Sequence, residues 1–185
     1  MALPNPGVVV DMLARLIAIA VSVVSMAAPT QAGLFLDQGH RSIIQAAQDA
    51  GLKYEVNPTD CPGDVDGFYT GDRLVVCQDR GTRGGPELQW SNNDLDTLRH
   101  EATHLVQDCK DGVIDMMLDA PSDTKVDEMI DRMGAERALY VWQRYHNRRL
   151  YMEGILVEIE AFHNARFTSA AQVAKEIKTY CPRVR

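Results

Sequence analysis

The residues best suited to chemistry in this sequence are two histidines and a glutamate in the segment His100-Glu101-Ala102-Thr103-His104. Side chains four positions apart lie one above the other on a helix, so His100 and His104 can direct two imidazole nitrogens at one metal ion. Glu101 then lies beside that ion, where a carboxylate can take a proton from water. Because chance produces such a pattern in about one chain in a hundred of this composition, the segment predicts a zinc site.

The sequence around these histidines has the period of an amphipathic helix, expected from about Asp94 to Lys110. Asn93 and Asp96 have the spacing of an N-cap and its N3 residue, and Asp111-Gly112 follows the expected end. The histidines lie opposite the apolar stripe, which argues against ordinary core histidines and leaves a solvated pair as the alternative to a metal site. The stripe consists of Leu95, Leu98, Ala102, Leu105, Val106 and Cys109.

A catalytic zinc site needs a third protein ligand and one open position. One large class uses a histidine six residues after the second, preceded by a glycine, but Lys110 and Gln107 occupy those positions. Glu158 is a better candidate, because it lies at the middle of the inward face of the helix expected over 151–165, and a buried carboxylate needs a cationic partner. Glu160 points almost the opposite way and is expected to be a solvated acid, retained as the fallback ligand.

The combination of His100-Glu101-Ala102-Thr103-His104 with Glu158-Ile159-Glu160-Ala161 resembles the zincin metallopeptidases of the gluzincin type. The resemblance covers the helical half of the chain. It implies that the two histidines and Glu158 bind Zn²⁺, that Glu101 is the general base, and that the substrate is a peptide or protein. Members often carry Asp or Asn after the alanine, whereas Phe162 stands there here, so the usual supporting contact is missing or supplied elsewhere.

The rest of the sequence predicts further helices and a few short strands, hence an α+β, zincin-like fold that is mostly helical with a small antiparallel sheet. Gly71-Asp72 indicates a tight hairpin between two of the strands. In zincins the strand before the metal helix lines the cleft and can pair with an extended peptide, and residues 73–78 are either that strand or an ordinary core strand. Strands are expected at 53–56, 67–70 and 73–77, and other helices at 37–50, 122–145 and 168–180.

The first 32 residues have the pattern of a secretory signal peptide. Leu16 to Met26 is an uncharged apolar run preceded by Arg15, and it is shorter than the roughly 20 residues that span a bilayer. We expect cleavage after Ala32, leaving a single domain over 33–185. Because the first residues fit a signal poorly, Met12 rather than the first methionine is the expected start.

The acidic balance of the chain restricts its partners. The formal net charge is −7, and it does not change when the signal is removed, because Asp11 and Arg15 cancel. Nucleic acids and anionic membranes select basic surfaces, so neither is an expected partner. We also expect no stable membrane insertion after signal cleavage, and a monomer.

All four cysteines follow the signal, and an even count in an exported chain indicates disulfides. Four cysteines allow three pairings. We favour Cys61 with Cys77, which closes a hairpin-sized loop, and Cys109 with Cys181, which ties the end of the metal helix to the end of the chain. Together with the signal, these cysteines predict a secreted or periplasmic protein.

Two functions remain after these observations. The first is an exported zinc metallopeptidase, which the position of Glu101 favours; the alternative is a catalytically inactive, zincin-like and disulfide-stapled binding protein, which the small size favours. Asp108 is the candidate for a carboxylate that hydrogen-bonds a histidine ring and so fixes its tautomer. The candidates for stabilising an oxyanion are Tyr140, Tyr145, His146 and Tyr151.

Overall fold

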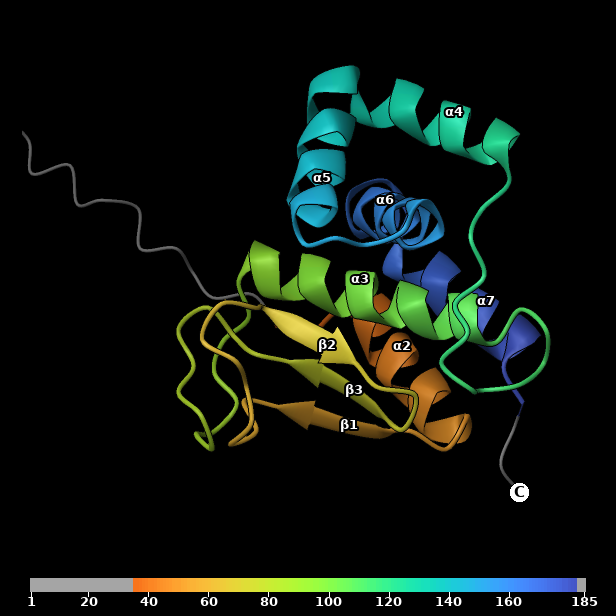
Figure 1. Cartoon of the computed structure of the whole chain (residues 1–185). Helices are drawn as coiled ribbons and strands as arrows, with labels where there is room; N and C mark the ends of the chain where they lie inside the picture. Colours follow the sequence, from red (N-terminus) through yellow and green to blue (C-terminus); the bar gives the residue numbers. More distant parts are fainter. Residues whose placement is uncertain (1–34, 183–185) are drawn as a thin grey trace, which may run out of the picture. The chain divides into compact units, whose positions relative to one another are not determined.

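Helices make up most of the structure, and one small sheet lies near its beginning (Figure 1). The computed structural model describes residues 35–182, and the expected signal segment lies outside these residues. The α+β composition agrees with the sequence prediction. The elements are α2 (Gln38–Asp49), β1 (Lys53–Val56), β2 (Gly67–Tyr69), β3 (Arg73–Val76), α3 (Asn92–Asp108), α4 (Asp123–Met133), α5 (Ala135–Asn147), α6 (Met152–Phe167) and α7 (Ala170–Tyr180).

The sheet is mixed, and the prediction of an antiparallel sheet was wrong. Its strand order is β1-β3-β2, with β3 parallel to β1 and antiparallel to β2. The expected hairpin does join β2 to β3, at Gly71, whose φ of 74° suits glycine. Since β3 is paired on both sides, residues 73–76 have no free edge, and the peptide-binding role expected of this strand was wrong as well.

Helix α3 starts earlier than its sequence suggested. Its N-cap is Ser91, whose hydroxyl accepts a hydrogen bond from the backbone N–H of Asp94 at 3.0 Å. The Asp94 carboxylate in turn accepts from the backbone N–H of Ser91 at 2.7 Å, which completes a capping box. The expected cap at Asn93 was therefore wrong; its side chain instead donates to Asp79 at 2.8 Å.

Two helices replace the single helix expected over 122–145. The chain breaks at Gly134, whose φ of 83° is a conformation that other residues rarely adopt. As a result α4 and α5 form an angled pair, and both contact α6 (Figure 1).

Helix α3 lies between two hydrophobic clusters. On one side it packs with α2, the sheet and α7, and on the other side it packs against α6, which also contacts α4 and α5 (Figure 1). Burial of apolar surface holds α3 in the first cluster and α6 in the second, and the two helices contact each other. The first cluster includes Ile43, Leu74, Leu98, Leu105 and Ile177; the second includes Met129, Val141, Ile155 and Ile159.

Two disulfides link Cys61 to Cys77 and Cys109 to Cys181, which is the favoured pairing. The second joins the end of α3 to the end of α7 and is buried at both sulfurs. Such bonds indicate an oxidising compartment. Within residues 35–182, every helix is too short or too polar to cross a membrane.

Candidate metal centre

Helix α3 brings the two histidines of the motif together. The Nε2 atoms of His100 and His104 are 3.2 Å apart, and their rings meet edge to face. Both side chains are largely buried, with His104 only 7% exposed, because α6 covers the face of α3 that lies opposite the apolar stripe. The site therefore lies at the contact between two helices instead of on a solvated surface.

Helix α6 directs the carboxylate of Glu158 at both histidines. Its Oε2 lies 3.3 Å from Nε2 of His100, and its Oε1 lies 3.8 Å from Nε2 of His104. A tetrahedral ion with bonds of about 2.0–2.1 Å has ligand atoms about 3.3–3.4 Å apart, which is close to the separations found here. Oε2 is also buried without a hydrogen-bond partner, which suits an oxygen that would bind a cation. These three side chains could together hold a metal ion.

Glu101 occupies a different position from Glu158. Its carboxylate forms a group with His100 and His104 whose ligand atoms lie within 4.8 Å of one another, and this group also could hold a metal ion. Glu158 is the closer carboxylate, since Glu101 makes no approach within 4.0 Å to either imidazole in the described structure. Glu101 therefore suits a role beside the ion better than a role as ligand.

The surroundings of the site shift the pKa values of its residues in different directions. Burial raises the pKa of Glu101 to about 7. Burial and the neighbouring His100 lower the pKa of His104 to about 4, which keeps its imidazole in the neutral form that binds metals. Burial works against the charge on Glu158, but His100 and His104 outweigh it and lower the pKa of this carboxyl group.

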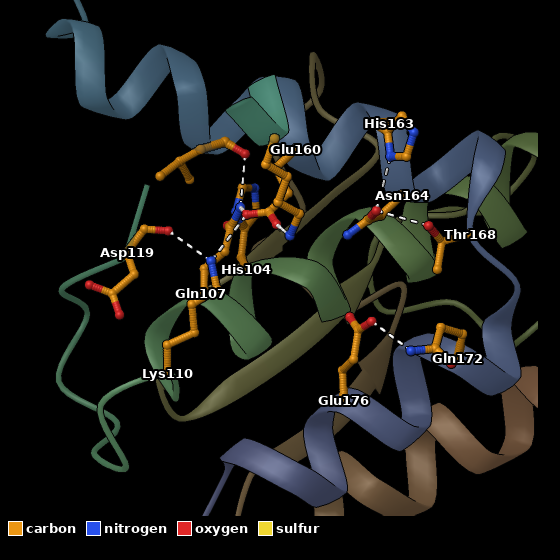
Figure 2. A network of polar contacts seen from close by, with 12 residues as sticks. His104, Gln107, Lys110, Asp119, Glu160, His163, Asn164, Thr168, Gln172 and Glu176 are labelled. Atoms are coloured by element: carbon orange, nitrogen blue, oxygen red, sulfur yellow. Dashed lines mark hydrogen bonds and ion pairs between the residues drawn. The ribbon is translucent and has the colours of Figure 1, made fainter. Parts of the chain in front are cut away.

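Glu160 is buried, and its expected place in solvent was wrong. Only 2% of it is exposed, and its carboxylate pairs with Lys125 of α4 and with Lys110 at 3.3 Å. Figure 2 shows Glu160 beside Gln107 and Lys110, and Gln107 also donates a hydrogen bond to its carboxylate. Glu160 therefore has its own counterions, and Glu158 alone faces the imidazoles.

Gln107 contacts the Nδ1 atom of the His104 imidazole, on the side opposite Nε2. Its Oε1 lies 2.8 Å from Nδ1 of His104, and its Nε2 donates to Glu160 at 2.9 Å and to the Val157 carbonyl at 3.0 Å (Figure 2). The proposed role of Asp108 was wrong, because Asp108 accepts from the Tyr69 hydroxyl at 2.5 Å. The i, i+3 spacing from His104 to Gln107 is the signal that could have identified this support.

We expect Gln107→Leu to weaken zinc binding by about 10–100-fold, because the imidazole of His104 loses the partner that orients it. Competition against a fluorescent zinc chelator measures this change. Gln172→Leu, on α7, is the matched control and should bind zinc like the wild type. Unchanged affinity in folded Gln107→Leu would show that the contact is dispensable.

A cleft of about 780 Å³ opens beside His100 and Glu101. Of the four oxyanion candidates, Tyr140 and Tyr145 line it. The other two do not: Tyr151 is 86% exposed, and His146 stacks on Trp142. Phe162, which replaces the usual Asp or Asn, also lines the cleft and packs edge to face on the His100 ring at 4.6 Å.

Tyr145 has the closest connection to the site. Its hydroxyl lies near enough to Glu158 to help lower the pKa of that carboxyl group. Burial and the negative charge of Glu158 in turn raise the pKa of Tyr145, so the hydroxyl keeps its proton and can donate it in a hydrogen bond.

No family model, no curated protein and no solved structure matches this chain significantly. Any proposal of a function therefore rests on the geometry of the site.

Proposed function

We propose that this protein is an exported zinc-dependent metallopeptidase with a zincin-like fold of the gluzincin type. One observation carries the proposal: Glu158 of α6 meets the paired Nε2 atoms of His100 and His104, while Glu101 faces the adjoining cleft. Three ligands with a carboxylate beside them are the parts that a hydrolytic zinc site requires. The two disulfides support export.

In this mechanism His100, His104 and Glu158 would hold the ion. When bound, zinc acts as a Lewis acid that lowers the pKa of water toward about 7 and polarises a carbonyl group. Glu101 takes a proton from the water that attacks the peptide carbonyl carbon, and it delivers the proton to the amine nitrogen as the C–N bond breaks. Tyr145 donates a hydrogen bond to the carbonyl oxygen as negative charge develops there.

The test combines metal analysis with peptide hydrolysis by the protein lacking residues 1–32. We expect one zinc per chain, hydrolysis that stops when a chelator removes the metal, and recovery when zinc is returned. His104→Ala should lose both zinc and activity, because one of three ligands is missing. His146→Ala is the matched control, since this exposed histidine lies outside the cleft.

Two results would contradict the proposal. Hydrolysis of peptides by His104→Ala at the wild-type rate would remove the site from the reaction. Stoichiometric zinc without hydrolysis of any peptide in a broad library would favour the alternative, a binding protein with a structural metal.

A further inference from the structure

The cleft beside the metal centre is lined by arginines, although the chain as a whole is acidic. Four of them line it: Arg137, Arg144, Arg148 and Arg166. Four carboxylates, those of Asp66, Asp96, Glu101 and Glu136, line the same cleft, so the number of arginines alone does not identify a ligand. A guanidinium without a carboxylate partner of its own is the group that could bind a negatively charged part of a substrate.

Arg166 and Arg148 already have partners. The Nε atom of Arg166 lies 2.5 Å from one carboxylate oxygen of Asp96, and Arg99 pairs with the other oxygen. Arg148 lies over the ring of Tyr145 with its guanidinium carbon 5.9 Å from the ring centroid. Both guanidinium groups therefore have partners, and Arg137 is exposed, so water can solvate its charge.

Arg144 differs from these neighbours. Its Nε atom is buried without a hydrogen-bond partner, and its one hydrogen bond in the described structure is a long one, 3.4 Å from Nη1 to the Tyr140 hydroxyl. No carboxylate among residues 35–182 lies within 4.0 Å of it, and Asp66 attracts it only over a longer distance. A partly buried guanidinium without a counterion is costly, so its position calls for a ligand.

Arg144 also lies near the metal centre, because it lines the same cleft as His100. Tyr145, the next residue of α5, lines this cleft as well and lies near Glu158. A substrate group bound at Arg144 would therefore lie next to the bond that the site cleaves.

We propose that Arg144 is a specificity residue that binds a carboxylate of the substrate beside the scissile bond. The planar guanidinium fork matches a carboxylate in two parallel hydrogen bonds, which a lysine cannot reproduce. The carboxylate belongs either to the free C-terminus of the substrate or to an Asp or Glu side chain. This inference rests on the proposed peptidase function for the identification of the ligand as a peptide.

Binding to the metal-free protein tests the inference without turnover. The probes are three fluorescein-labelled hexapeptides with one neutral sequence: the first has a free C-terminal carboxylate, the second is amidated and contains one internal Glu, and the third is amidated with Gln in its place. Fluorescence polarisation should show one of the first two bound about 10–100-fold more tightly than the third. The tighter of the two identifies the source of the carboxylate.

Three variants localise the effect. Arg144→Met should abolish the preference, and Arg144→Lys should recover only part of it, because the second hydrogen bond is missing. Lys175→Met, an exposed charge on α7, is the matched control and should keep the full preference. With zinc-loaded protein, Arg144→Met should raise KM for the preferred peptide about tenfold or more and change kcat much less.

The outcomes separate this inference from the proposed function. Equal affinity for all three peptides, or a preference that survives in folded Arg144→Met, overturns the carboxylate site while hydrolysis of peptides can still stand. A preference that depends on Arg144 in a zinc-loaded protein that cleaves no peptide supports the carboxylate site and overturns the peptidase.

Discussion

Glu101→Gln is expected to keep its zinc and to lose peptide hydrolysis by about 10²–10⁴-fold. The amide has the shape of the carboxylate but cannot accept a proton at neutral pH, so the attacking water keeps its proton. Zinc content should not change, because Glu158 is the carboxylate that lies against the histidines. The measurements are zinc per chain by atomic emission and kcat/KM on a peptide that the wild type cleaves.

The matched control for this variant is Glu153→Gln, which removes an exposed carboxylate from the same helix as Glu158. It should leave both zinc content and kcat/KM at the wild-type level. If Glu101→Gln loses zinc as fully as His104→Ala, then Glu101 is a ligand and the assignment of Glu158 is mistaken. If it cleaves peptides at the wild-type rate, the proton transfer belongs to another group.

Replacing both cysteines of the second disulfide, in Cys109→Ala with Cys181→Ala, should lower the free energy of unfolding by about 4 kcal/mol. The bond spans 72 residues, so its loss frees a long stretch of the unfolded chain. Since small domains are stable by only about 5–15 kcal/mol, this variant should be near the limit of folding. Urea unfolding followed by circular dichroism measures the change.

The first disulfide provides the comparison. It spans 16 residues, so Cys61→Ala with Cys77→Ala should cost about 3 kcal/mol by the same reasoning. The second pair also ties the end of α3 to α7, and its loss should therefore weaken zinc binding more than the loss of the first pair does. Equal stability of both variants and the wild type would show that packing alone holds these segments.

The sequence predicted the parts of the site that depend on one helix. His100 and His104 follow from helical periodicity, because spacing of four residues sets side chains on one face whatever the helix packs against. The direction of Glu158 follows in the same way from its position on α6. The two cysteine pairs follow from loop length and from the expected end of the metal helix.

The sequence analysis missed features that depend on contacts between elements. Three short strands carry no information on which pairs with which, so the parallel pairing of β1 with β3 could not be read from them. Glu160 was misplaced because α6 was treated as a helix with one solvated face. Its apolar residues Ile155, Leu156, Val157 and Ile159 surround the axis, which is typical of a helix buried on all sides.

The hydrogen bonds of Gln107 have a consequence for how the ion is held. Gln107 contacts both His104 and Glu160, and Glu160 in turn is neutralised by Lys125 from α4. The orientation of one imidazole thus depends on a helix that contributes no ligand. We therefore expect metal binding and the docking of α4 to be thermodynamically linked, so that a variant that loosens α4 also binds the metal more weakly.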